Sequence, residues 1–130
     1  MDKIFNYIDG EFSTAIGKNW LDNYNPSSGS VYSQIPDSNE KDIASAEKAA
    51  QSAFPNWSKT SLKERSAILL RIAELITKNL DDLALAECID NGKPLALAKK
   101  VDIPRAAANM SFFATAILHE NSDAHEMNQV

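Results

Sequence analysis

Cys88 is the only cysteine among the 130 residues and the one thiol that could act as a nucleophile. It lies between Glu87 and Ile89, near the end of a segment with helical periodicity, at a spacing that fits the buried side of that helix. A nucleophilic thiol requires a neighbour that favours the thiolate and an open approach for the substrate. Neither feature is visible around Cys88, so the sequence favours a packed core thiol and predicts no catalytic residue.

Two histidines, His119 and His125, lie among Glu120, Asp123 and Glu126 and raise the question of a metal site. Two ligands on adjacent turns of one helix must be three or four residues apart. The two histidines do not meet this requirement, so a solvated tail is the expected structure for this segment.

Asp90 is the first residue of the motif Asp90–Pro94, and a helix is expected to end at Asn91-Gly92 within this motif. The Asp90 carboxylate is therefore expected at the C-terminal end of that helix. The helix dipole disfavours an acid at this end, so a cation, a hydrogen bond or solvent must compensate the charge. A plain exposed carboxylate remains the alternative interpretation of Asp90.

Arg105 lies near the start of an otherwise apolar segment of small residues. A guanidinium in this setting could bind a carboxylate through two parallel hydrogen bonds. A surface charge or a structural ion pair is the alternative interpretation.

The composition excludes several classes of function. A net charge of −5 and a pI near 4.9, with acids and bases interleaved, argue against a nucleic-acid-binding surface. The four glycines are scattered, and no glycine-rich strand-to-helix turn is present to bind phosphate. No apolar run is long enough to cross a bilayer, and the polar N-terminus does not resemble a secretory signal. With a lone cysteine, a cytoplasmic protein without membrane partners is the simplest expectation.

The first 36 residues are predicted to form β structure. Asp9-Gly10 between apolar residues indicates a tight hairpin turn, because glycine adopts positive φ at little cost. A second extended pair is expected on either side of Asn25–Gly29, over Trp20–Tyr24 and Val31–Ile35. Such a short β meander requires helices to cover its apolar face.

After Pro36 the apolar period becomes helical, and residues 37–120 are predicted to form helices. Asp37 with Glu40 resembles a capping pair for the first helix, and Pro55 is expected to end it. Ser61-Leu62-Lys63-Glu64 has the pattern of a capping box for the second helix.

A third helix is expected to begin within Asn79–Asp82 and to end at Asn91-Gly92. Pro94 can open a short helix through Lys99, and a last helix is expected from Asp102. Residues 121–130 are expected to form a frayed tail. The predicted fold is therefore one α+β, mainly α domain: N-terminal β meander or hairpins, followed by four or five helices.

Several short motifs, in their order along the chain, resemble the N-terminal segment of the NAD-dependent aldehyde dehydrogenase superfamily. These motifs are Tyr7–Phe12, Asn25–Tyr32, Ala49-Ala50, Phe54–Trp57, Glu64-Arg65 and Asp90–Pro94. Their shared order and spacing extend the resemblance from about Tyr7 to Phe113. Within the superfamily, Val101–Asn109 and Phe112–Ala114 are most similar to the 2-hydroxymuconic and 2-aminomuconic semialdehyde dehydrogenases.

The resemblance implies a reaction in which a cysteine thiolate attacks an aldehyde and hydride then passes to NAD. A glutamate activates the water that hydrolyses the thioester, and an asparagine amide stabilises the oxyanion. In the family these three residues and the Rossmann core lie beyond the part that this chain matches. Cys88 and Glu87 do not match the family's cysteine and glutamate, so the isolated chain is expected to bind no NAD and to be inactive.

Two family sites have matching positions in this chain. Many members bind a structural Na⁺ or K⁺ at a main-chain carbonyl before the Asn-Pro turn and at the acid of the Asn-Gly-Lys-Pro motif. The matching residues are Asn23, Tyr24 and Asp90, whose oxygens suit a hard monovalent cation. The last helix matches the wall of the substrate tunnel, where Arg105 would bind the distal carboxylate of a semialdehyde and Asn109 would share the wall.

The resemblance thus implies a structural and substrate-entry part of an enzyme that oxidises a carboxylated semialdehyde. The expected partners are the remainder of the enzyme chain and a small aldehyde, within a homo-oligomer. A stand-alone truncated scaffold or partner-binding module without catalysis is the alternative, and its apolar faces would then favour self-association. A complete small enzyme is disfavoured because no nucleophile–base pair can be assembled from the motifs.

Overall fold

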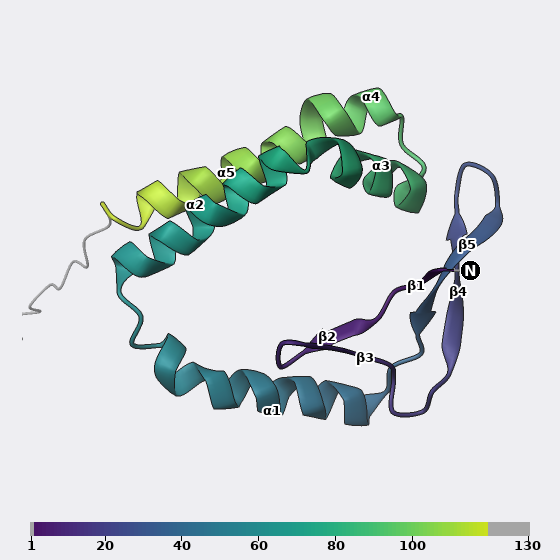
Figure 1. The fold of residues 1–130 in the computed structure, drawn as a ribbon, viewed down its shortest axis with the longest axis horizontal. Coiled ribbons are helices and arrows are strands. Elements are labelled where there is room, and N and C mark those ends of the chain that lie inside the picture. The colour runs from purple at the N-terminus through teal and green to yellow at the C-terminus, as the bar shows by residue number, and fades with distance from the viewer. Residues whose placement is uncertain (1, 120–130) are drawn as a thin grey trace, which may run out of the picture.

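The computed structural model describes residues 2–119, with strands first and helices after them (Figure 1). The strands are β1 (Asp2–Lys3), β2 (Asn6–Ile8), β3 (Glu11–Ser13), β4 (Trp20–Asn25) and β5 (Ser30–Pro36). The helices are α1 (Glu40–Trp57), α2 (Leu62–Lys78), α3 (Leu80–Asn91), α4 (Leu95–Leu97), the π-helical turn η1 (Ala98–Asp102) and α5 (Ile103–Ala116). This order confirms the predicted α+β, mainly α fold class.

The strands form two small sheets, in agreement with the predicted β meander or hairpins. β2 and β3 form a separate antiparallel hairpin, and its turn at Asp9-Gly10 has positive φ at both residues, as predicted. The other sheet has the order β1-β5-β4, with β4 antiparallel and β1 parallel to β5. A parallel pair requires a long connection, and the hairpin lies within that connection.

A β-bulge interrupts the pairing of β4 with β5. Tyr24 pairs with Val31 and Asn23 with Ser33, so Tyr32 is the extra residue of the bulge. Bulges bend the strand and redirect the side chain that they carry. This irregularity brings the Tyr32 hydroxyl toward the end of α3.

Asn39 caps helix α1, which corrects the predicted capping role of Asp37 and Glu40. The Asn39 side chain accepts a 2.9 Å hydrogen bond from the amide of Lys41. The buried Asp42 carboxylate accepts the Asn39 amide at 2.9 Å and the Ile16 amide at 2.8 Å. Asp42 therefore completes the capping box and also ties the preceding loop to the helix, a double role that Glu40 at the first helical position cannot fill.

Pro55 lies inside α1 and does not end it, which corrects a second expectation. The helix continues to Trp57, and Arg65 of α2 donates 3.1 Å hydrogen bonds to the carbonyls of Trp57 and Ser58. The last carbonyls of a helix have no hydrogen-bond partner within it. The Arg65 guanidinium therefore stabilises the last turn of α1, which extends past Pro55.

Helices α2 and α3 begin and end as the sequence predicts. Ser61 and Glu64 form the capping box, with Glu64 N to Ser61 Oγ at 3.2 Å and Ser61 N to Glu64 Oε2 at 3.0 Å. Gly92 ends α3 in the left-handed conformation, with φ of 77°. The caps thus fix both helices locally.

The two last helices predicted from Pro94 and Asp102 are one continuous helical path. α4 leads into the π-helical turn η1, where the Ile103 amide bonds to the Ala98 carbonyl five residues earlier. Pro104 follows immediately and carries no N–H, so it cannot extend the ordinary ladder at this point. The path continues into α5 instead of breaking.

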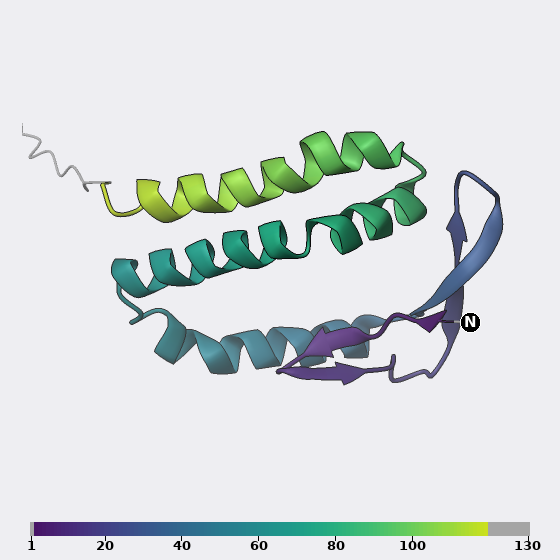
Figure 2. The ribbon, with the colours of Figure 1, turned by 45° about the horizontal axis from the view of Figure 1, so that its top comes forward.

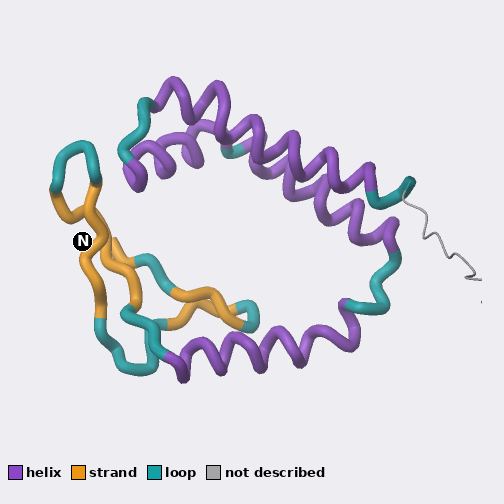
Figure 3. The backbone as a smooth tube through the Cα atoms, turned by 180° about the vertical axis from the view of Figure 1, so that it is seen from behind, coloured by secondary structure: helices purple, strands orange, loops and turns teal. Residues whose placement is uncertain are grey.

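Helices α2 and α5 pack side by side, whereas α1 lies on the other side of the molecule beside the β2–β3 hairpin (Figures 1 and 2). The sheet of β1, β5 and β4 lies at one end and links the two sides (Figure 3). Small buried residues let α2 and α5 approach closely: Ser66, Ala73, Ala107 and Ala114. Many large apolar side chains stay exposed, among them Ile43, Phe54, Leu70, Leu75, Phe112 and Phe113. The buried part of the described region therefore consists mainly of alanines.

Candidate functional site

Three elements meet at the carboxylate of Asp90, in the last turn of α3. Its Oδ1 accepts a 2.5 Å hydrogen bond from the Tyr32 hydroxyl of β5 and a 3.2 Å bond from Asn23 Nδ2 of β4. The same Asn23 amide also donates to the Tyr32 oxygen at 2.8 Å. These donors supply the compensation that an acid at a helix C-terminus requires.

The electrostatics of this cluster follow from those hydrogen bonds. The Tyr32 hydroxyl, and then the Asn23 amide, lower the pKa of Asp90 below its usual value. The bond to Asp90, together with burial, raises the pKa of Tyr32 above its usual value. The cluster therefore holds an ionised carboxylate beside a protonated phenol at neutral pH.

The structure brings together two of the three residues predicted to hold a cation. Asn23 reaches Asp90 through its side-chain amide, which donates to the carboxylate. The cation ligand predicted before the Asn-Pro turn is instead a main-chain carbonyl of Asn23 or Tyr24. Sequence reasoning missed Tyr32, because its position depends on a bulge that no local pattern marks. Within residues 2–119, Oδ2 of Asp90 has no hydrogen-bond partner, which leaves a carboxylate oxygen available to a hard cation.

A hollow of about 630 Å³ adjoins this cluster, between β1 and β5 on one side and α3 and the start of α5 on the other. Most of its lining side chains are apolar, and three acids, Asp2, Glu87 and Asp90, also line it. It is lined by Asp2, Ile4, Tyr32, Leu83, Ala86, Glu87, Ile89, Asp90 and Ile103. Its apolar walls suit a hydrophobic group, while the acids disfavour an anion.

Arg105 and Asn109, the predicted substrate-binding residues, are one turn apart on α5 and both exposed. Ala108 and the exposed Phe112 share their face, because residues three, four and seven positions apart lie on one side of a helix. The opposite face carries the buried Ala107 and packs on α2. The structure thus presents a guanidinium, an amide and an aromatic ring along one exposed stripe of α5.

Lys93 links the end of α3 to η1. Its ammonium forms ion pairs with Glu87 at 2.9 Å and Asp102 at 2.8 Å, and its side chain is only 24% exposed. Hydrogen bonds from the ammonium to Asp102, and then to Glu87, raise the pKa of Lys93. Lys93 therefore bridges an acid of α3, Glu87, and an acid of η1, Asp102.

The other candidate chemical groups do not assemble. Cys88 is half-buried on α3, and His119 is exposed after α5, while His125 lies outside the described residues. Over residues 2–119, no three metal-binding side chains of the His, Cys, Asp or Glu type come together. Within the described part of the chain, Cys88 and His119 form no nucleophile–base hydrogen bond.

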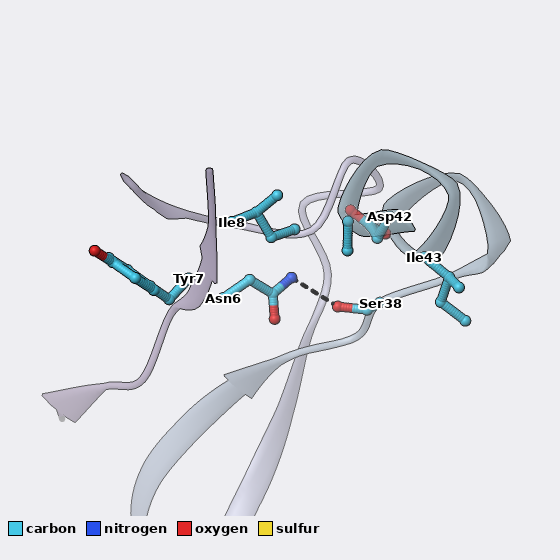
Figure 4. Close-up of a pocket in the computed structure, with 7 residues that line it drawn as sticks. Asn6, Tyr7, Ile8, Ser38, Asp42 and Ile43 are labelled. Carbon is cyan, nitrogen blue, oxygen red and sulfur yellow. Dashed lines mark hydrogen bonds between the residues drawn. The ribbon is translucent and has the colours of Figure 1, made fainter. Parts of the chain in front are cut away.

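A second hollow, of about 240 Å³, lies between the hairpin and the start of α1 (Figure 4). Asn6 Nδ2 donates to Ser38 Oγ at 2.9 Å across it, and Asp42 lies on its wall. The carboxylate of Asp42 accepts hydrogen bonds from two main-chain amides, which ties it to the local backbone. This hollow is structural.

Comparison with known proteins identifies the family. A model of the aldehyde dehydrogenase family matches residues 12–129, which is most of the chain. The chain belongs to the aldehyde dehydrogenase family. The resemblance seen in the sequence motifs is thereby confirmed.

The relatives that the chain resembles include proteins named as muconic semialdehyde dehydrogenases. The chain is 44% identical to the 2-aminomuconic semialdehyde dehydrogenase of Bos taurus over 96% of its length and 25% of that protein's. It is 36% identical to the 2-hydroxymuconic semialdehyde dehydrogenase of Pseudomonas sp. (strain CF600), over 98% of its length and 26% of that protein's. The chain thus spans about a quarter of these relatives.

Solved aldehyde dehydrogenases contain the same arrangement of elements. The NAD⁺ complex of an aldehyde dehydrogenase from Bacillus cereus superposes with a TM-score of 0.91 and 32% identity, over 98% of this chain and 26% of that one. An indole-3-acetaldehyde dehydrogenase in its apo form gives 0.88 and 30%, over 94% of this chain and 28% of that one. Over residues 2–119, no helix combines the length and apolar character that crossing a membrane requires.

Proposed function

We propose that this chain is the N-terminal, substrate-entry part of an NAD-dependent aldehyde dehydrogenase that oxidises a carboxylated semialdehyde to the acid. The observation that carries the proposal is the exposed Arg105, in a chain that is similar to proteins named as muconic semialdehyde dehydrogenases. A muconic semialdehyde carries a carboxylate at the end opposite its aldehyde. A guanidinium binds such a group through two parallel hydrogen bonds.

Asn109 and Phe112 extend this binding surface along the same face of α5. The amide offers a further hydrogen bond, and the ring offers a flat apolar contact for a conjugated chain. Arg105 would bind the distal carboxylate and thereby orient the aldehyde toward catalytic groups supplied by the remainder of the enzyme. Binding of this kind raises the rate by positioning the substrate.

Residues 2–119 offer no glycine-rich turn of the kind that binds the pyrophosphate of NAD. NAD accepts the hydride in the family's reaction, and its pyrophosphate requires a glycine-rich turn at a helix N-terminus. The positive-φ glycines described here lie at two strand turns and at a helix C-terminus: Gly10, Gly29 and Gly92. We therefore assign the chain no step that involves the cofactor.

A two-dimensional ¹H–¹⁵N NMR titration of this chain with muconate, and separately with NAD, tests the proposal. Muconate should shift the amides around Arg105 and Asn109, and Arg105→Gln should abolish the shifts. Arg71→Gln is the matched control, because Arg71 is an exposed arginine of α2 paired with Glu74. If the Arg105→Gln variant binds muconate as well as the unchanged chain, the role of Arg105 is refuted. If the chain binds NAD saturably, the proposal that the cofactor site lies in the remainder of the enzyme is refuted.

We also propose that Asp90, with main-chain oxygens of Asn23 and Tyr24, contributes to a Na⁺ or K⁺ site in the whole enzyme. The ionised carboxylate at the negative end of the α3 dipole and its second, unengaged oxygen support this proposal. Monovalent cations bind such oxygens weakly, so further ligands from the remaining chain are needed. Exchange of K⁺ for a large organic cation should lower the melting temperature of the whole enzyme, and Asp90→Asn should remove this dependence. A melting temperature insensitive to the cation would refute the site.

A stand-alone scaffold or partner-binding module is the second candidate, favoured by the exposed apolar side chains. Such a module would self-associate or bind another protein without catalysis. Analytical ultracentrifugation distinguishes the two functions: a discrete oligomer with no muconate binding favours the module.

A further inference from the structure

We infer that Lys93 keeps the Arg105 guanidinium available to an anionic ligand by holding the carboxylate of Asp102. The inference rests on the proposed role of Arg105 in binding a carboxylate. It assigns a positioning role to Lys93, which contacts neither the proposed ligand nor Arg105.

Asp102 and Arg105 are natural partners within the helix. They lie three residues apart at the junction of η1 and α5, where opposite charges are neighbours and attract each other. Despite this spacing, Arg105 forms no ion pair within residues 2–119. Asp102 turns instead to Lys93, with its Oδ2 2.8 Å from the ammonium.

Lys93 is well placed to retain Asp102. It follows Gly92, the left-handed end of α3, and its amide bonds to the Asn91 side chain at 3.2 Å. Its ammonium is anchored on the other side by Glu87, and the three side chains are only partly exposed. Ion pairs that are shielded from water are weakened less by solvent and salt than exposed ones.

Removal of the Lys93 charge would release Asp102 as an intramolecular competitor for Arg105. An added carboxylate would then have to displace Asp102 from the guanidinium. The competition predicts weaker binding of the external anion, and it predicts that removal of the Asp102 charge as well restores the binding. A purely structural role of Lys93 predicts no such restoration.

The chain offers a matched control in Lys99. This lysine lies in η1 and also pairs with an acid of α3, Asp81, at 2.7 Å. The pair is more exposed, with 40% and 79% of the two side chains accessible, and Asp81 is remote in sequence from Arg105. Lys99→Met therefore removes an α3–η1 ion pair and one positive charge without releasing Asp102.

The experiment is a muconate titration of this chain followed by ¹H–¹⁵N NMR, with the dispersion of the spectra as the check of folding. Lys93→Met should weaken muconate binding roughly two- to fivefold, as expected for a competing surface ion pair. The double variant Lys93→Met/Asp102→Asn should restore the original affinity for muconate. The double variant Lys93→Met/Glu87→Gln should not restore it. Lys99→Met should bind muconate with unchanged affinity.

The outcomes separate this inference from the proposed function. If Arg105→Gln leaves muconate binding intact, the proposed function fails. If Arg105→Gln abolishes binding while Lys93→Met leaves it unchanged, only the role of Lys93 fails. If Lys93→Met loses muconate affinity and the added Asp102→Asn substitution does not restore it, the role of Lys93 is likewise overturned. If the Lys93→Met chain is unfolded, Lys93→Gln takes its place in the same comparison.

Discussion

The Tyr32 hydroxyl donates a 2.5 Å hydrogen bond to the carboxylate of Asp90, 58 residues later in the chain. This bond joins β5 to the C-terminal end of α3, and Asn23 of β4 reinforces it. Ionisation of the Asp90 carboxyl therefore strengthens the attachment of β4 and β5 to the end of α3.

Replacement of Tyr32 by phenylalanine should raise the pKa of Asp90 toward its usual value near 3.8, because the largest cause of its lowering is removed. A carboxyl group with a lowered folded-state pKa stabilises the fold above about pH 3.8, and this contribution is lost as the pH falls through the lowered value. The stability difference between the two proteins should thus be present at neutral pH and shrink in acid. Carboxyl-detected NMR measures the titration, and an unchanged Asp90 curve would contradict the assignment.

Replacement of Asp42 by alanine should destabilise the chain by about 1–3 kcal/mol, because the amides of Ile16 and Asn39 lose their buried acceptor. Asp37→Ala is the matched control, since exposed Asp37 does not cap α1. Urea unfolding followed by circular dichroism gives both values. Equal losses in the two variants would show that Asp42 has no special role.

Gly92→Ala should cost more stability than Gly29→Ala. Both glycines have positive φ, 77° and 69°, which strains any other residue by about 1–2 kcal/mol. At Gly92 a new Cβ would also lie 3.2 Å from Cβ of Pro26, whereas at Gly29 it would meet nothing within 4 Å. Thermal melts of the two variants measure the difference, and a smaller loss at Gly92 would contradict the close approach of α3 to the Pro26 turn.

Ala107→Leu should destabilise the chain by about 1–3 kcal/mol, since this buried alanine lies where α5 packs closely on α2. Ala108→Leu adds the same volume on the exposed face and serves as the control. Urea midpoints that shift equally would show that the two helices do not pack through small residues.

The sequence predicts the elements whose signals are local. The Asp9-Gly10 turn, the Ser61–Glu64 capping box and the Gly92 helix end all depend on residues within a few positions of each other. Each of these motifs satisfies its own backbone groups, so it forms in the predicted place whatever surrounds it.

The errors arise where distant residues decide the outcome. Pro55 does not end α1 because Arg65, in the next helix, stabilises the carbonyls beyond it. Asp42, and not Asp37, forms part of the cap of α1, because its carboxylate also accepts the Ile16 amide of an earlier loop. No periodicity or spacing rule contains these tertiary contacts.

The candidate site shows the same division. Asp90 and Arg105 were identifiable from charge in an unusual setting, and family resemblance supplied their expected partners. Tyr32 and the Lys93–Asp102 pair were not identifiable, because a bulge and a π-helical turn place them. The residue types at a bulge or a π-helical turn do not reveal that the backbone is irregular there.

The parallel pairing of β1 with β5 constrains the order in which the sheet can assemble. β1 leaves the ribosome before its partner, so Asp2 and Lys3 have no strand to join until Ser33 and Gln34 have been made. The hairpin β2–β3 and the β4–β5 pair close short loops and can form sooner, since local contacts cost less chain entropy. We therefore expect β1 to pair with β5 only after the β4–β5 pair has formed.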